Sequence, residues 1–85
     1  MDRNEIEAIV IDAIKEILNN TETNITAETN LRDDLSINSM DTMNLAMELE
    51  ERFDEYEVEI PDEAVYGLTT VASVVDKIEQ EIAHA

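Results

Sequence analysis

The chain has 85 residues and a mass of 9.6 kDa, which suits one small domain over residues 1–85. Its 22 Asp and Glu against 5 Lys and Arg give a net charge of −17, and it has no cysteine. This balance argues against nucleic acids and anionic membranes as partners, because both are bound through Lys and Arg. The sequence also lacks a signal peptide and any apolar run of about 18 residues. We therefore expect a monomeric protein of the cytoplasm, not inserted in a membrane, whose partners are basic.

The first predicted element is an amphipathic helix over residues 3–18. Its apolar residues share one broad face at about 100° per residue; they are Ile6, Ile9, Val10, Ala13, Ile14 and Ile17. The polar segment that follows, residues 19–38, is longer than most loops of compact domains. We expect four apolar side chains to pin it to the core, namely Ile25, Leu31, Leu35 and Ile37.

A second helix is predicted over residues 39–53, with Asn38 as its N-cap and Asp41 in its first turn. Its apolar residues form two groups on a helical wheel. Within one arc of about 100° lie the core candidates Leu45, Ala46, Leu49 and Phe53. About 140° away lie Met40, Met43 and Met47, here called the methionine face, flanked by Asn44, Glu50 and Glu51.

The methionine face is either a further part of the hydrophobic core or an exposed docking surface. The first arc already supplies a core face of the expected width. Thioether side chains adapt to differently shaped partners and recur on promiscuous binding surfaces. Acidic flanks would suit a partner with an apolar patch ringed by Lys and Arg. We therefore favour docking.

The rest of the chain predicts an acidic connection over residues 54–59 and then two helices. Pro61 suits the first position of a short helix, and Gly67 suits a left-handed C-cap at its end. Thr70 is the predicted N-cap of a last helix with the apolar stripe Val71, Val74, Val75, Ile78 and Ile82. The predicted fold is all-α, a small four-helix bundle of three longer helices and one short helix before the last.

No catalytic residue or metal site is expected. Asp33 and Asp34 form a carboxylate pair, but no further group completes an acid–base site around them. The sole histidine, His84, stands one residue from the end of the sequence. A calcium loop counted from Asp34 fails, because Ser39 stands where glycine is required. Nucleophilic triads, zinc sites and phosphate loops lack their residues.

Ser39 is the residue of greatest interest. A serine at a helix start is usually an ordinary capping-region residue. A hydroxyl there is nevertheless well placed to carry a phosphate, because the free N–H groups and the helix dipole favour negative charge. Position alone does not decide between these interpretations.

The sequence around Ser39 resembles the second-helix signature of acyl carrier proteins. The matching residues are Leu35-Ser36-Ile37-Asn38-Ser39-Met40-Asp41-Thr42-Met43, followed by Leu45, Glu48-Leu49-Glu50-Glu51 and Phe53-Asp54. Downstream, the openings of the family's third and fourth helices are similar to Glu59-Ile60-Pro61-Asp62-Glu63 and Leu68-Thr69-Thr70-Val71. The resemblance spans residues 31–78 in the family's order.

The resemblance implies that a phosphopantetheinyl transferase moves 4′-phosphopantetheine from coenzyme A onto Ser39. The thiol of this arm then holds an acyl chain as a thioester, so the protein is a carrier and not an enzyme. It also implies that the second helix contacts basic acyltransferases, synthases or acyl ligases. By position, the contacting residues are Asn38, Met40, Asp41, Met43, Asn44, Met47, Glu50 and Glu51.

Several departures from the family pattern bear on the pathway. The usual Asp-Ser-Leu is Asn38-Ser39-Met40, and the Gly commonly two residues before the Asp is Ser36. Asn44 replaces a commonly acidic residue, and the connection before Ile60 is three residues longer. These changes favour a specialised lipid, lipopolysaccharide or polyketide pathway over primary fatty acid synthesis. Two alternatives remain, an acidic interaction module with this fold but no prosthetic group, and an aminoacyl carrier of the D-alanyl or peptidyl type.

Overall fold

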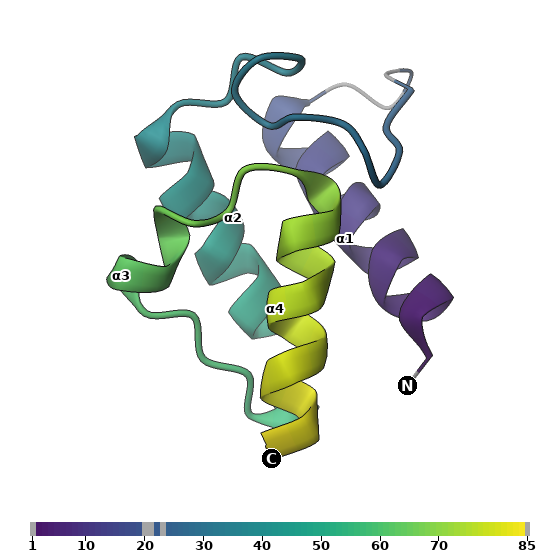
Figure 1. Ribbon diagram of the computed structural model, residues 1–85, viewed down its shortest axis with the longest axis vertical. Coiled ribbons are helices and arrows are strands. Elements are labelled where there is room, and N and C mark those ends of the chain that lie inside the picture. Colours follow the sequence, from purple (N-terminus) through teal and green to yellow (C-terminus); the bar gives the residue numbers. More distant parts are fainter. Residues whose placement is uncertain (1, 20–21, 23, 85) are drawn as a thin grey trace.

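The computed structural model describes residues 2–19, 22 and 24–84 (Figure 1). In chain order the elements are α1 (Arg3–Leu18), α2 (Ser39–Arg52), a 3-10 helix η1 (Asp54–Tyr56), α3 (Asp62–Val65) and α4 (Val71–His84). The prediction of an all-α fold with three longer helices and one short one is confirmed. None of the helices in these residues is long and apolar enough to cross a membrane.

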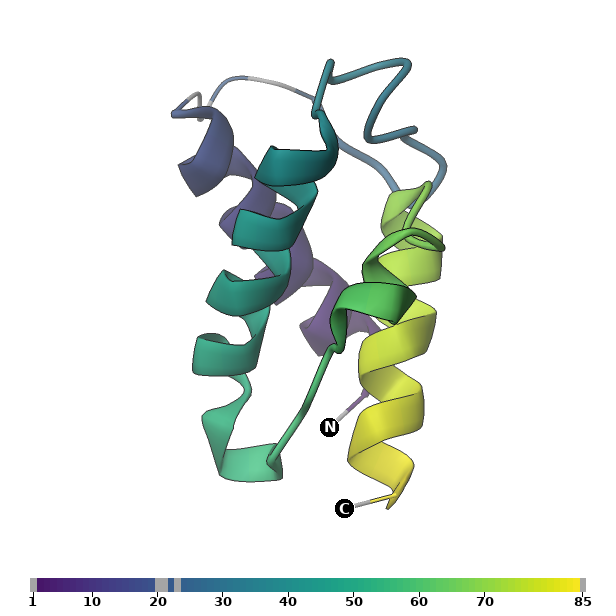
Figure 2. The ribbon, with the colours of Figure 1, turned by 90° about the vertical axis from the view of Figure 1, so that its left-hand side faces the viewer.

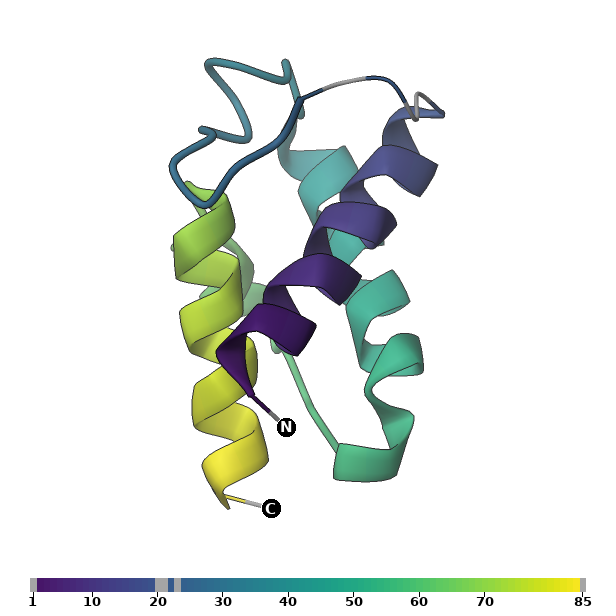
Figure 3. The ribbon, with the colours of Figure 1, turned by 90° about the vertical axis from the view of Figure 1, so that its right-hand side faces the viewer.

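The N-terminal helix α1 has the bounds that the sequence predicts. Asp2 caps its start by accepting a hydrogen bond from the Glu5 N–H at 3.0 Å. Asn19 ends it in the left-handed conformation, with a φ of 54°. The helix packs against both α2 and α4 and crosses them obliquely (Figures 2 and 3).

One hydrophobic core lies between the three long helices. The predicted core face of the second helix is confirmed, because Leu45, Leu49 and Phe53 are fully buried and Ala46 nearly so. The helix ends one residue earlier than predicted, and Phe53 is its C-cap. The predicted stripes of α1 and α4 supply most of the remaining buried side chains, namely Ile6, Val10, Ala13, Ile14, Val71, Val74, Val75 and Ile78.

The long segment before α2 is pinned as predicted. Ile25, Leu31 and Ile37 are buried, and Leu35 packs against the core from a half-buried position. Backbone hydrogen bonds also tie this segment to the start of α4, from the Leu31 N–H to the Thr69 carbonyl at 2.9 Å and from the Val71 N–H to the Thr29 carbonyl at 3.1 Å. Residues 24–38 are therefore fixed across the end of the bundle at which α2 and α4 begin (Figure 1).

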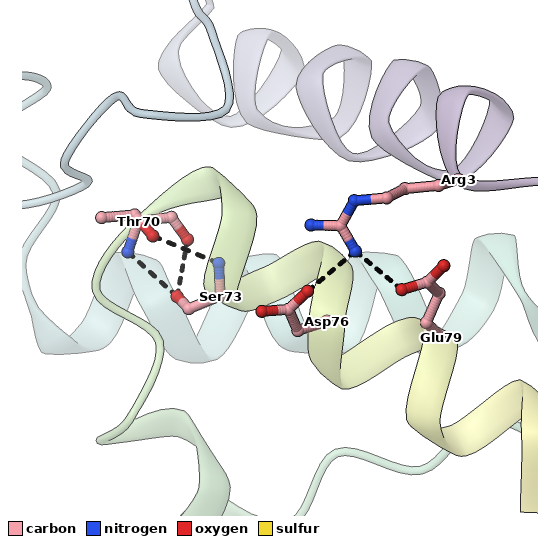
Figure 4. Close-up of polar contacts among 5 residues, drawn as sticks. All are labelled: Arg3, Thr70, Ser73, Asp76 and Glu79. Atoms are coloured by element: carbon pink, nitrogen blue, oxygen red, sulfur yellow. Dashed lines mark hydrogen bonds and ion pairs between the residues drawn. The ribbon is translucent and has the colours of Figure 1, made fainter.

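The start of α4 has a reciprocal cap (Figure 4). The Ser73 N–H donates to Thr70 Oγ1 at 3.1 Å, and Ser73 Oγ accepts from the N–H groups of Thr69 and Thr70 at 3.0 Å each. This confirms Thr70 as the cap, with Ser73 in the role that Glu or Gln plays in a capping box. Farther along α4, Asp76 and Glu79 form ion pairs with Arg3 at 2.8 and 2.7 Å.

The prediction of a left-handed cap at Gly67 is wrong, because the φ of Gly67 is not positive. The short helix instead ends in i→i+3 hydrogen bonds, from the Gly67 N–H to the Ala64 carbonyl and from the Leu68 N–H to the Val65 carbonyl, each at 3.1 Å. These tighter bonds satisfy the last carbonyls without a left-handed residue. Pro61 is also the N-cap of α3 and not its first residue.

The acidic connection after α2, which is three residues longer than in the family pattern, is folded against the bundle. It contains η1, which the sequence analysis did not predict, and turns at Glu57 with a φ of 55°. The centroid of the Tyr56 ring lies 6.5 Å from that of the Phe53 ring, and Val58 and Ile60 are buried. Apolar side chains therefore hold the extra residues in place.

Candidate functional site

Ser39 is the first residue of α2, and its side chain is exposed. Asn38 is the N-cap, as predicted, because its Oδ1 accepts the Asp41 N–H at 2.8 Å. The Asn38 carbonyl accepts both the N–H and the hydroxyl of Thr42, each at 2.9 Å, which explains why this threonine can be buried. The N–H groups of Ser39 and Met40 have no acceptor within the described residues. The start of α2 thus presents a hydroxyl beside free backbone donors.

The turn before Ser39 is held by its own polar side chains. Asn30 Oδ1 accepts the N–H groups of Arg32 and Asp33 at 3.0 and 2.8 Å. Asp34 Oδ2 accepts the Asn30 N–H at 2.7 Å, so this carboxylate has a local structural role. The Ile37 N–H then donates to the Leu31 carbonyl at 2.9 Å and closes the turn.

Ser36 adopts a left-handed conformation, with a φ of 58°. Such a φ is unfavourable for a residue with a Cβ atom and costs glycine nothing. It gives a physical reason for the glycine that is common at this point of the family pattern. Here Ser36 makes the same turn at some cost in stability.

Arg32 is a site residue that the sequence analysis missed. Its Nη2 donates to Ser39 Oγ at 3.4 Å, a long but recognisable hydrogen bond. The available signal was that Arg32 is the only Lys or Arg between Lys15 and Arg52. Its distance from Ser39 along the chain hid the contact, which depends on the intervening turn.

A cavity of about 290 Å³ adjoins Ser39. Arg32 and Ser39 line it together with apolar side chains of the pinned segment and of the segment around α3, namely Leu31, Ile37, Val65 and Leu68. Thr42 and Tyr66 also contribute to its lining. The exposed hydroxyl therefore lies at a partly apolar recess and not on a flat surface.

The methionine face is exposed, as predicted. Met40, Met43 and Met47 have exposed fractions of 73%, 40% and 65%, whereas the core face of the same helix is buried. Among the flanking residues, Asn38, Asn44 and Glu51 are exposed, and Asp41 and Glu50 are half-buried. Glu50 Oε2 also accepts the Ile60 N–H at 2.9 Å, so this carboxylate holds the acidic connection to α2. Partner binding by these residues stays a prediction.

In the described part of the chain, no three His, Cys, Asp or Glu side chains are grouped so as to hold a metal ion. His84 is the last residue of α4.

The family model for the phosphopantetheine attachment site matches residues 8–78. Together with the helical fold, this match defines a domain that carries a phosphopantetheine group. The chain is similar to an acyl carrier protein of Prochlorococcus marinus (strain MIT 9515), with 39% identity over 79 residues that cover 93% of this chain and 95% of that protein.

Its fold is similar to the solved structure of a protein assigned as an acyl carrier protein from Mycobacterium tuberculosis. The TM-score is 0.78 at 31% identity, and the match covers 88% of this chain and 96% of that one. The chain belongs to the acyl carrier protein family. Members of this family are carriers and not enzymes, and their prosthetic group is phosphopantetheine.

Proposed function

We propose that 4′-phosphopantetheine is attached to Ser39 and that the protein carries acyl groups as thioesters on this arm. The observation that supports this most directly is the exposed Ser39 hydroxyl in the first turn of α2, inside the matched residues 8–78. The arm supplies a thiol, which a chain without cysteine does not have. The roles of the protein are to present the hydroxyl and to bind the phosphate that joins the arm to it.

The donors around Ser39 fit a phosphate group. The free N–H groups at the start of α2 and the helix dipole both favour negative charge at this point. The Arg32 guanidinium adds a positive charge in contact with Ser39 Oγ. The Asn38 cap holds the helix start, and hence the hydroxyl, in a defined position. The adjoining cavity gives the chain attached to the arm a partly apolar surface.

The first test is the mass of the intact protein after incubation with a phosphopantetheinyl transferase and coenzyme A. We expect the wild type to gain the mass of one 4′-phosphopantetheine and Ser39→Ala to gain none. Ser36→Gly is the control, because it removes a nearby exposed hydroxyl and suits the left-handed φ of 58°. This control should gain the full mass. A modified Ser39→Ala or an unmodified wild type contradicts the assignment.

The methionine face and its polar flanks are the proposed contact surface for basic enzymes. These enzymes are the transferase itself and acyltransferases, synthases or acyl ligases of a specialised lipid, lipopolysaccharide or polyketide pathway. Exposed thioethers beside carboxylates supply both adaptable apolar contact and charge steering. The carrier in this proposal is a single domain over residues 1–85 that works as a cytoplasmic monomer.

Met43→Glu tests this surface while Ser39 stays intact. A carboxylate at the centre of the methionine face should raise the KM of the transferase for the protein about tenfold or more, since burying a charge without a partner is costly. Ala8→Glu is the matched control, because it adds the same charge at an exposed position of α1. We expect its KM to stay within about twofold of the wild type, the range usual for a position outside the contact. Equal effects of the two variants would exclude the methionine face as the contact.

Mass spectrometry of the protein isolated from its own cells separates the alternative functions. An acyl thioester supports the proposal, an amino acid or peptide on the arm supports an aminoacyl carrier, and a chain that never carries the arm supports a pure interaction module.

A further inference from the structure

Among the residues that the structure describes, Arg32 has no carboxylate partner, although the chain is strongly acidic. Of the 5 Lys and Arg residues, Arg3, Arg52 and Lys77 form ion pairs with Asp or Glu. Lys15, on α1, has none among the described residues. Arg32 forms none within the described residues, although Asp33 and Asp34 follow it directly in the sequence. Its side-chain hydrogen bond is to Ser39 Oγ.

The backbone of Arg32 is held on both sides. Its N–H donates to Asn30 Oδ1 at 3.0 Å, and its carbonyl accepts the Ser36 N–H at 3.0 Å. The preceding Leu31 is 2% exposed and anchored to Thr69 by a backbone hydrogen bond. The guanidinium is therefore carried on a fixed turn, while the side chain itself is exposed.

We propose that Arg32 binds the phosphate that joins the arm to Ser39 and so positions the arm at the cavity that both residues line. This inference rests on the proposed attachment at Ser39. The phosphorus bonds directly to Ser39 Oγ, so its oxygens lie within reach of a guanidinium that already contacts that atom. A guanidinium offers two parallel N–H donors to phosphate oxygens, and such charge-assisted hydrogen bonds are stronger than neutral ones.

The charge of the chain gives Arg32 a second reason to matter. A phosphodiester adds one negative charge to a protein whose net charge is already −17. The addition falls near Asp33, which lines the same cavity as Ser39, and near Asp41, which lies in the same first turn of α2. The positive charge of the Arg32 guanidinium, which contacts Ser39 Oγ, offsets this local repulsion. Arg32 is thus a positioning residue for the arm and takes no part in thioester chemistry.

The direct test is the NMR signal of the Arg32 Nε–H in 15N-labelled protein before and after modification. The signal is assigned by its absence in Arg32→Gln. We expect it to shift when the arm is attached, because the guanidinium gains phosphate oxygens as acceptors. Arg3 and Arg52 are internal controls with carboxylate partners of their own, so their signals should stay unchanged. An unchanged Arg32 signal in fully modified protein overturns the inference.

A thermal cycle supplies an independent readout. For each variant the melting temperature of the unmodified protein is subtracted from that of the modified protein. We expect this difference to be about 4 °C more negative in Arg32→Gln than in the wild type, and the gap to shrink in high salt. Arg32→Lys should fall between the two, because it keeps the charge but loses the paired donors.

Arg3→Gln is the matched control for this cycle. It removes the same charge from the first residue of α1. In Figure 1, α1 begins at the end of the bundle away from the start of α2, so the difference for this variant should equal that of the wild type. Equal differences in Arg32→Gln and Arg3→Gln contradict a specific role for Arg32. If Arg32→Gln is not modified to completion, the NMR signals of the wild type decide.

The mass measurement separates the two proposals. A wild type that gains no mass, or a Ser39→Ala variant that does, overturns attachment at Ser39 itself. A mass gain on Ser39 with an unchanged Arg32 signal overturns only the role of Arg32.

Discussion

Leu49→Ala is expected to lower the free energy of unfolding by about 2–5 kcal/mol. Leu49 lies on the core face of α2 and is fully buried. Its truncation removes apolar contacts and leaves a cavity that the three long helices cannot fully close. The whole stability of a small domain is only about 5–15 kcal/mol, so this change removes a large part of it. Urea unfolding followed by circular dichroism measures the loss.

Met47→Ala is the matched control for this prediction. It shortens a side chain of similar size on the same helix, but Met47 is 65% exposed. We expect its effect on the free energy of unfolding to stay within about 0.5 kcal/mol. Similar losses in the two variants would mean that the methionine face is packed in solution.

Arg52→Gln is expected to lower the free energy of unfolding by about 1–3 kcal/mol. Arg52 is the last residue of α2 and has a half-buried side chain, 22% exposed. It pairs with Asp12 at 2.6 Å, with Glu48 at 2.9 Å and with Glu16. It therefore joins α2 to α1. The hydrogen bonds to Asp12 and Glu48 raise the pKa of Arg52, so the guanidinium stays charged throughout the accessible pH range.

The loss in Arg52→Gln has two sources. The ion pairs between the helices are broken, and the three carboxylates then repel one another in a chain of net charge −17. Added salt screens this repulsion, so the difference from the wild type should decrease as ionic strength rises. Lys15→Gln changes the charge equally at a residue without an ion pair among the described residues, and should cost less than about 0.5 kcal/mol. Equal losses in both variants would show that net charge alone is responsible.

The acidic composition has acquired a more specific meaning from the site. Asp41, Glu50 and Glu51 flank an exposed apolar surface beside Ser39, which suits basic enzymes. Glu50 also accepts the Ile60 N–H, so this carboxylate stabilises the fold in addition to its proposed contact with a partner. Family membership gives the class of these partners, and the departures at Asn38 and Asn44 direct the proposal towards a specialised pathway.

Features that depend on local chemistry were predictable from the sequence. The bounds of α1, the Asn38 and Thr70 caps and the two faces of α2 follow from periodicity and from side chains next to the backbone they cap. The region around Ser39 was recognisable because the residues of the family signature are consecutive. Each of these features needs only a few neighbouring residues to form.

Features that depend on packing between distant segments were decided by the tertiary structure. Gly67 has no left-handed φ, because i→i+3 hydrogen bonds close the end of α3 before Leu68 enters the core. The longer connection forms η1 because Tyr56 and Val58 pack into the core and the Glu50 carboxylate accepts the Ile60 N–H.

The contact between Arg32 and Ser39 was also decided by the tertiary structure. The sequence by itself determined the three long helices, their core faces, the acidic surface and the serine of the proposed attachment. Only the tertiary structure brought the Arg32 guanidinium into hydrogen-bond contact with Ser39, because the contact requires the left-handed turn at Ser36 and the anchoring of Leu31 to Thr69. The neighbours of a side chain depend on which segments the tertiary fold brings together, and local secondary-structure propensity carries no information about these contacts.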